Sequence, residues 1–311
     1  MLQPARRMAS VNAAELAARL GQAYRSGSWW RCRCPVHGSA RATLALKDGD
    51  WGLIAHCHAG CRRTDVIAEL RRRGFLDAGS SKHGPAIKRR GCEAEDADRR
   101  WRIVRAMDIW RTSYPARGTI VEAYLLSRGL TMPVPPTLRM HGLMRHRESG
   151  ERRPAMVALV EHPEAGPVGV HITYLNPLDP SVKVSLEPRK RLIGPSTGAA
   201  IRLAEVRPDR ALIVGEGIES TLSLMQLRGL PGWAAVSTAG LRALVLTPAV
   251  RRVLIAVDRD ANGAGEAAAR DGGRRWILEG REVRLAMPLG LGDFNDIVQR
   301  GTSNGIQCLG C

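Results

Sequence analysis

Four short, mostly apolar runs in the last third of the 311-residue chain constrain its fold more than any other feature. They lie at residues 211–214, 233–237, 253–257 and 283–287, and helix-like segments lie between them at 219–227 and 266–279. Strands that alternate with helices in this way form parallel crossover connections. The sequence therefore predicts an α/β domain with a mostly parallel sheet over residues 206–300, followed by a frayed tail at 301–311.

Carboxylates follow the predicted strands at the points where those strands end. Glu216 comes just after the first run, Asp258 and Asp260 follow the third, and Asp293 follows the last. The carboxyl ends of parallel strands meet at one edge of a sheet, where open α/β folds bind their ligands. Carboxylate oxygens suit Mg2+ or Mn2+, which can bridge phosphate oxygens. We therefore predict catalytic, metal-binding roles for Glu216, Asp258 and Asp260, with Asp293 as a further magnesium ligand. Asp296 also follows the last run, but its alternative to a metal role is to cap a final helical turn.

A cluster of cysteine and histidine residues lies near the N-terminus. Cys34 and His37 form a C-x2-H pattern, and Cys57 and Cys61 form a C-x3-C pattern. Tetrahedral zinc takes four thiolate or imidazole ligands, and a β-hairpin can bring two such turns together. The sequence predicts a closed, structural zinc site with these four ligands, in a zinc-ribbon domain over residues 1–76. The neighbouring residues Cys32, His56 and His58 stay open as alternative ligands.

The segments around this cluster are predicted to be short helices and a linker. Asn12, with Glu15 three residues later, forms a capping-box pattern that opens a helix to about Arg25, and Thr64 is expected to cap a second helix. Residues 77–94 are rich in Gly, Ser, Lys and Pro, which is typical of a linker between domains.

The predicted middle region, residues 95–205, combines helices with an antiparallel sheet. Helices are expected at 96–112 and from Thr119 to Gly129, and strand-like segments separated by turns at 155–160, 168–174 and 190–193. The fold class expected for the chain is therefore α/β, with an N-terminal zinc ribbon of β-strands, a mixed α+β middle region and a mostly parallel C-terminal sheet.

The charge of the chain indicates its class of partner. Lys and Arg number 47 against 30 Asp and Glu, which gives a formal net charge of +17. Such a balance favours polyanions, because each neutralised phosphate releases counterions. A coding bias toward Arg is the alternative explanation. The sequence has no run of 18 apolar residues and no apolar segment behind its basic start, so we expect a cytoplasmic protein without a membrane partner.

The N-terminal cluster resembles a known family. The run CPVHGSARATLALKDGDWGLIAHCHAGC is similar to the CHC2-type zinc ribbon of bacterial and phage DNA primases. In that family the ribbon contacts the template strand. The resemblance implies template contacts for Arg31, Arg33, Arg41 and the strand surface near Trp51, since an aromatic ring there can stack on a base. Packing within the ribbon is the alternative role for Trp51.

The C-terminal carboxylates resemble the metal site of the Toprim domain, which primases, topoisomerases and some nucleases share. Glu216 matches the glutamate of that family, and Asp258 and Asp260 match its DxD motif. Replicative primases usually carry an aspartate four residues after the glutamate, whereas Ser220 stands at that position here. The ending Gly292-Asp293-Phe294-Asn295-Asp296 is similar to the version found in phages and mobile elements.

The order of zinc ribbon, middle region and Toprim-like domain resembles that of DNA primases. In primases the segment before Toprim is a basic wall that faces the metals. The resemblance therefore implies nucleotide or nucleic-acid contacts for Lys183, Arg189, Lys190 and Arg191. It also implies a DNA primase-like nucleotidyltransferase of a phage, plasmid or other mobile element, with Zn2+ as structural and Mg2+ or Mn2+ as catalytic cofactor.

The expected partners of such an enzyme are a single-stranded DNA template and nucleoside triphosphates. The sequence contains no Walker A motif, so a replicative helicase would be a separate protein. Two other functions stay open. One is a non-catalytic DNA-binding accessory protein of replication, and the other is a metal-dependent Toprim nuclease.

Overall fold

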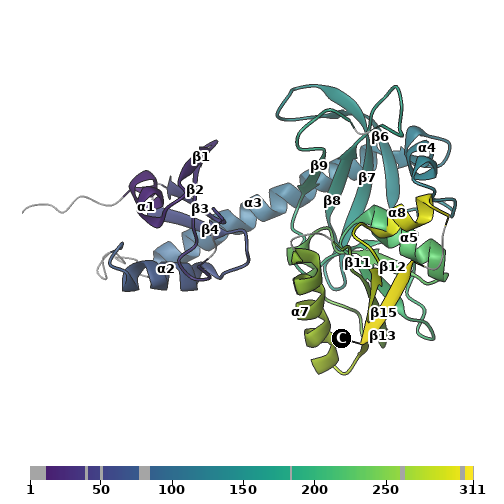
Figure 1. Cartoon of the computed structure of the whole chain (residues 1–311). Coiled ribbons are helices and arrows are strands. Elements are labelled where there is room, and N and C mark those ends of the chain that lie inside the picture. Colours follow the sequence, from purple (N-terminus) through teal and green to yellow (C-terminus); the bar gives the residue numbers. More distant parts are fainter. Residues whose placement is uncertain are drawn as a thin grey trace, which may run out of the picture. The chain divides into compact units, whose positions relative to one another are not determined.

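The computed structural model describes residues 12–38, 41–49, 52–76, 85–182, 184–259, 263–301 and 305–310 (Figure 1). The chain divides into two compact units, Met1–Gly91 and Cys92–Cys311. Among the described residues, no helix combines the length and apolar character needed to cross a membrane.

The first unit contains a small antiparallel sheet and two helices. Its elements are α1 (Ala13–Leu20), β1 (Tyr24–Ser26), β2 (Trp29–Cys32), β3 (Leu44–Gly49), β4 (Gly52–Cys57) and α2 (Arg63–Arg72). The described strands pair in the order β1-β2-β3-β4. Leu16 of α1, Leu70 of α2 and the β3 residues Leu44 and Leu46 are fully buried together, so both helices pack against the sheet.

Two predicted helix boundaries in this unit are wrong. The Asn12 side chain caps α1 by accepting a hydrogen bond from the backbone N–H of Glu15 at 2.8 Å. That helix ends at Leu20 rather than near Arg25, because Gly21 takes a left-handed φ of 85°. Thr64 is not the cap of α2, since the helix already begins at Arg63.

The long helix α3 (Pro85–Thr112) contains the boundary between the two units, and a five-stranded sheet follows it in the second unit. Residues 85–94 of the predicted linker are therefore helical. The sheet contains β5 (Tyr114–Pro115), β6 (Leu138–Arg145), β7 (Arg152–His162), β8 (Gly166–Tyr174) and β9 (Lys190–Ile193), with helix α4 (Ile120–Ser127) between β5 and β6. All pairs are antiparallel, as the turn-separated runs predicted. Ala106, Met107 and Trp110 of α3 pack on one face of this sheet, against Val157 and Ile172.

A six-stranded sheet fills the C-terminal part. Its elements are β10 (Ile201–Arg202), β11 (Leu212–Gly215), α5 (Ile218–Arg228), β12 (Gly232–Ala234), α6 (Thr238–Ala243), β13 (Arg252–Ala256), α7 (Ala264–Leu278), β14 (Glu282–Pro288), α8 (Phe294–Gln299) and β15 (Ile306–Gly310). The described strands are ordered β10-β12-β11-β13-β14-β15, and the four central strands are parallel. The predicted α/β domain with a mostly parallel sheet is confirmed.

The side chains of the central strands alternate between two cores. Ile213 and Ala256 face the core that contains α5, α8 and strands β6 and β7 of the other sheet. Leu212, Val214 and Ile255 face the opposite core, with residues of α6 and α7. Figure 1 shows α7 on one side of this sheet and α5 and α8 on the other. The sheet is therefore covered on both faces, which is usual for parallel strands.

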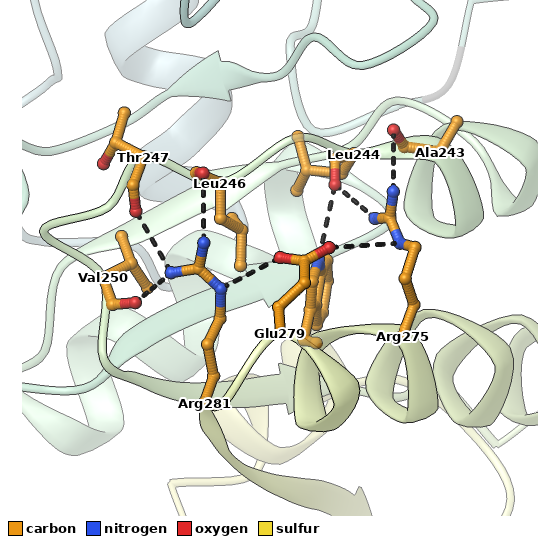
Figure 2. A network of polar contacts seen from close by, with 9 residues as sticks. Ala243, Leu244, Leu246, Thr247, Val250, Arg275, Glu279 and Arg281 are labelled. Atoms are coloured by element: carbon orange, nitrogen blue, oxygen red, sulfur yellow. Dashed lines mark hydrogen bonds and ion pairs between the residues drawn. The ribbon is translucent and has the colours of Figure 1, made fainter.

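The segment between α6 and β13 has little regular structure, and two arginines hold it in place (Figure 2). Arg281 donates to the backbone carbonyls of Leu246 and Thr247 at 3.2 and 3.1 Å, and also to that of Val250. Arg275 donates to the carbonyls of Ala243 and Leu244, and Glu279 forms ion pairs with both arginines. These contacts satisfy carbonyl groups that have no strand or helix partner of their own.

The C-terminal tail contains a strand, so the prediction of a frayed end is wrong for residues 306–310. β15 pairs antiparallel with β14, with Ala286 opposite Cys308. The strand is formed by this pairing, because its own sequence, Ile-Gln-Cys-Leu-Gly, has only weak strand preference.

Candidate functional site

Four residues of the first unit form the predicted Cys/His cluster. One ligand atom each from Cys34, His37, Cys57 and Cys61 lies within 4.8 Å of the others. The Nδ1 atom of His37 is 3.1 Å from the Cys61 sulfur and 3.8 Å from the Cys57 sulfur. The two turns that carry these residues flank the hairpin of β3 and β4, as the pattern predicted.

The geometry of this cluster fits a tetrahedral zinc ion. Zn–S bonds of about 2.3 Å at tetrahedral angles place sulfur atoms about 3.8 Å apart. The sulfurs of Cys34 and Cys61 are separated by 4.0 Å. The other ring nitrogen of His37, Nε2, lies 3.1 Å from the Thr43 hydroxyl, which can fix the orientation of the ring. The four side chains therefore lie close to the positions that a tetrahedral zinc ion requires.

The alternative ligands lie outside this cluster. Cys32 is fully buried in β2, and burial raises the pKa of its thiol to about 12, as expected for a packed, protonated cysteine. His56 and His58 stack edge to face with ring centroids 4.7 Å apart. Neither histidine belongs to a metal-binding group among the described residues.

The predicted template contacts of the ribbon have different environments. Arg31 is half-buried, and its Nε atom donates to the backbone carbonyl of Ala42 at 3.2 Å. Arg33 is exposed. Trp51 lies outside the described residues.

The predicted carboxylates of the second unit meet at one rim of the parallel sheet. Glu216 follows β11, Asp258 follows β13, and these two strands are neighbours. The backbones of Arg259 and Gly292 exchange two hydrogen bonds, of 3.0 and 3.1 Å, which join the loop after β13 to the loop that carries Asp293. Glu216, Asp258 and Asp293 all line one pocket of about 400 Å3. Asp260 lies outside the described residues.

Asp258 has the electrostatic environment of a cation ligand. Burial raises the pKa of its carboxyl group to about 7, and the charges of Asp293 and Glu216 act in the same direction. Its Oδ2 atom accepts a hydrogen bond from the Ser220 hydroxyl at 3.0 Å. Its Oδ1 atom is buried and has no hydrogen-bond partner among the described residues. A divalent cation would supply both the missing partner and the missing positive charge.

Asp293 and Asp296 also have a structural role. Asp293 is the N-cap of α8, and its side chain accepts from the backbone N–H of Asp296 at 3.0 Å. The Asp296 carboxylate in turn accepts from the N–H of Asp293 at 3.1 Å, which completes a capping box. Asn295 is buried and donates to the carbonyl of Arg128 at 2.7 Å. Thus one oxygen of Asp293 already has a partner, while the residue still lines the pocket.

A larger pocket of about 650 Å3 lies between the two sheets of the second unit. Glu216 and Asp258 line it from the parallel sheet, and Lys190 of β9 lines it from the antiparallel sheet. Glu219 belongs to the same pocket. It accepts hydrogen bonds from the Tyr124 hydroxyl at 2.8 Å and from the Lys190 ammonium group at 3.1 Å. The sequence contains no local signal for the roles of Glu219 and Tyr124, because their partners lie 29 and 95 residues away along the chain.

The remaining predicted basic contacts are arranged around β9. Arg189 is exposed, lines the same pocket and forms an ion pair with Glu187 at 2.8 Å. Arg191 is half-buried, next to Tyr174, where its charge opposes the rise that burial causes in the pKa of the phenol. Lys183 lies outside the described residues.

Two family models match the second unit. Residues 211–304 match the model described as "Toprim domain", and residues 100–203 match a domain of unknown function (DUF7146). A search of curated protein sequences found no match.

Several solved structures are similar to this chain. The zinc-binding and RNA polymerase domains of the Aquifex aeolicus primase are 15% identical, with a TM-score of 0.42 over 96% of this chain and 84% of that chain. The primase fragment of the bacteriophage T7 primase-helicase protein is 14% identical, with a TM-score of 0.39 over 87% and 94%. The Escherichia coli primase catalytic core is 15% identical, with a TM-score of 0.36 over 60% and 57%.

The residues that match the Toprim model cover the part of the chain that forms the parallel strands. The matched residues begin one residue before β11 and contain the parallel strands, the rim carboxylates and helix α8. Residues 211–304 are therefore a Toprim domain, carried on the same chain as an N-terminal cluster of three cysteines and one histidine with zinc-site geometry.

Proposed function

We propose that this protein is a DNA primase-like nucleotidyltransferase. The observation that carries the proposal is the rim of the Toprim domain, where Glu216, Asp258 and Asp293 line one pocket and Asp258 keeps a buried oxygen without a partner in the described structure. Paired with a Cys/His cluster like that of CHC2 ribbons, such a rim supports primer synthesis better than it supports a purely structural role.

Each part of the rim has a role in this proposal. Glu216, Asp258 and Asp260 are the catalytic ligands of Mg2+ or Mn2+, and Asp293 adds one oxygen to the same site. The bound ion would neutralise charge on the phosphates and on the pyrophosphate leaving group. Lys190 and Arg189 line the neighbouring pocket and would contact phosphate oxygens of the incoming nucleoside triphosphate, together with Lys183 and Arg191.

The zinc ribbon has the role of binding the template. Cys34, His37, Cys57 and Cys61 would hold a structural Zn2+ that fixes the hairpin. Arg31 and Arg33 would then contact the backbone of single-stranded DNA, and Trp51 would stack on a base. A helicase would act as a separate partner, in the cytoplasm of a cell that hosts a phage, plasmid or other mobile element.

The test is incorporation of labelled nucleotides on a single-stranded template with Mg2+ or Mn2+. Wild type should make short primers, and Asp258→Ala should reduce the product by at least about a hundredfold, because the ion loses a ligand at the reacting phosphate. The zinc content of both proteins serves as the control for folding. Absence of product from wild type, under conditions where another primase is active, would contradict the proposal.

One observation favours the non-catalytic alternative. Ser220 stands where replicative primases usually carry an aspartate, and its hydroxyl is bonded to Asp258. The rim therefore has one carboxylate fewer than theirs. Salt-sensitive binding of single strands without turnover, equal in wild type and Asp258→Ala, would identify an accessory protein. Cleavage of DNA in the absence of nucleotides would identify a nuclease.

A further inference from the structure

A half-buried ion pair in the larger pocket joins three elements that are distant in sequence. Glu219 lies in the first turn of α5, Tyr124 in α4 and Lys190 in β9. The Lys190 ammonium nitrogen is 3.1 Å from each of the two Glu219 carboxylate oxygens, and the Tyr124 hydroxyl donates to Oε1 at 2.8 Å. The carboxylate therefore has donors on both of its oxygens.

These contacts give the Glu219 carboxylate partners within the protein, whereas Asp258 at the rim keeps an oxygen without a partner among the described residues. Burial alone would raise the pKa of its carboxyl group, yet the charge of Lys190 and the hydrogen bond from Tyr124 hold that pKa at about 2. Glu219 is thus an anion at any working pH, and its negative charge is compensated within the protein. Its side chain is only 15% exposed. A carboxylate enclosed in this way interacts with Lys190 and Tyr124 rather than with an ion from solvent.

Lys190 is the most exposed member of this group. Its side chain is 50% exposed, and it lines the same pocket as Glu216 and Asp258. A lysine ammonium group has three N–H donors, and two hydrogen bonds go to Glu219. Without the carboxylate, a half-exposed lysine would sample many rotamers, so an anchored lysine loses less entropy when it binds an anion.

We propose that Glu219 and Tyr124 are positioning residues that hold the Lys190 ammonium group at the pocket wall, where it contacts a phosphate oxygen of a bound nucleotide. This inference rests on the proposed function for the ligand class. The inference gives three acidic residues of the pocket different partners. Glu216 and Asp258 would bind a cation, whereas Glu219 binds a lysine.

The alternative role for this ion pair is a purely structural tie between residues 100–203 and the Toprim domain. The chain offers a matched control for that role. Gln226, also on α5, accepts from the backbone N–H groups of Thr131 and Met132 at 2.7 and 3.2 Å and donates to the carbonyl of Gly129 at 2.9 Å. It joins the same parts of the chain, and it does not line the pocket.

The first experiment tests the positioning without any nucleotide. Brief acetylation followed by mass spectrometry measures the reactivity of Lys190, and Lys47 in the other unit serves as the internal reference. We expect Lys190 to react about three- to tenfold faster in Glu219→Gln than in wild type, and to a smaller extent in Tyr124→Phe, because the amine leaves its carboxylate partner. Gln226→Ala should leave the reactivity unchanged. Equal reactivity in wild type and Glu219→Gln would overturn the positioning role, whatever the function of the protein.

The second experiment tests the ligand. Binding of ATP with Mg2+ is titrated for wild type, Glu219→Gln, Lys190→Met and the double variant. Glu219→Gln should weaken binding about three- to tenfold in the wild-type background and have no further effect once Lys190 is replaced. Gln226→Ala should lower the melting temperature and keep the affinity. An equal effect of Glu219→Gln in both backgrounds would overturn the inference and leave the proposed function standing. Absence of ATP binding by wild type would overturn both the ligand class and the proposed function.

Discussion

At the scale of single residues, Asp258 is a proposed metal ligand whose buried carboxyl group makes folding less favourable. Its pKa is about 7 in the folded protein, whereas an unperturbed aspartate ionises near pH 4. The folded state therefore loses stability relative to the unfolded chain as the pH rises from about 4 to 7, because only the unfolded chain releases the proton readily. A group that is unfavourable for folding and lines a pocket is expected where a ligand binds.

This cost predicts the behaviour of Asp258→Asn. In EDTA at pH 8 the variant should melt a few degrees above wild type, since the neutral amide avoids the buried charge. Addition of Mn2+ should raise the melting temperature of wild type more than that of the variant. Thermal unfolding with and without Mn2+ measures both effects. A variant that melts below wild type in EDTA would show that the carboxylate is stabilising, contrary to this account.

His171 predicts a pH dependence of the opposite sign. Burial in β8, together with the charge of Lys190, lowers its pKa to about 4, although Glu219 acts against this shift. The folded protein keeps His171 neutral, while the unfolded chain binds a proton below about pH 6.5. The free energy of unfolding should therefore fall between pH 6.5 and 4 by up to about 3 kcal/mol from this residue.

The variant His171→Gln isolates this contribution, because Asp258 titrates in an overlapping range. Urea unfolding at pH 7.5, 6 and 5 should show a difference between wild type and variant that depends on pH, with the variant losing less stability on acidification. Parallel pH profiles for the two proteins would indicate that His171 is protonated in the folded state.

At the scale of elements, the segment between α6 and β13 depends on arginine rather than on regular structure. Arg281 is 11% exposed and donates to three backbone carbonyls within residues 246–250. Removal of its side chain would take one donor from each of these carbonyls, and only that of Thr247 is known to keep another, the backbone N–H of Val250 at 3.0 Å. The expected cost is about 1–3 kcal/mol. The same segment precedes the strand that carries Asp258, so its order is relevant to the rim.

We therefore expect Arg281→Ala to lower the melting temperature and to increase hydrogen exchange in residues 244–250. Arg281→Lys should recover only part of the loss, since an ammonium group cannot reproduce the planar fork of donors. Arg284→Ala is the matched control, because Arg284 is 67% exposed and, within the described part of the chain, forms its ion pair with Glu282 at 3.2 Å. If Arg281→Ala and Arg284→Ala are equally stable, the carbonyl contacts contribute little.

At the scale of the whole molecule, the Cys/His cluster and the Toprim domain lie in different compact units. The first unit has a small core, and zinc ligation is expected to contribute much of its stability. Removal of zinc should therefore unfold residues 12–76 and leave the exchange protection of the parallel sheet in place. Hydrogen exchange before and after treatment with a strong chelator measures this difference.

Two variants sharpen this prediction. Cys57→Ser should abolish binding of the one zinc ion per chain, whereas Cys32→Ala, at a buried cysteine outside the cluster, should retain it. Metal analysis of the purified proteins gives both values. Loss of zinc from Cys32→Ala in a protein that is still folded would mean that the ligand set includes Cys32.

Much of this architecture could be predicted from the sequence because its signals are local. The runs that became β11, β13 and β14 are apolar except for Arg252 at the start of β13 and Glu282 and Arg284 in the first half of β14. Long apolar stretches are typical of strands that are buried on both faces. The carboxylates follow at the ends of these strands, so the rim could be predicted from strand order alone. The spacing of Cys34, His37, Cys57 and Cys61 is likewise a short-range pattern.

The features that could not be predicted depend on partners distant in sequence. β15 is a strand because it can pair with the edge of β14. Glu219 interacts with Lys190 and Tyr124, which lie 29 and 95 residues before it. The start of α3 was missed for another reason. Residues 85–94 have the charged, Gly-containing composition of a linker, while most of them are also acceptable helix formers.

The position of β15 has a practical consequence for work with this protein. The strand closes one side of the Toprim sheet by pairing along β14. A truncated form that stops before Ile306 would leave the backbone N–H and C=O groups on that side of β14 open to strands of other molecules. Self-association of a shortened protein would then reflect the exposed strand edge, and it would be no guide to how the 311-residue chain assembles.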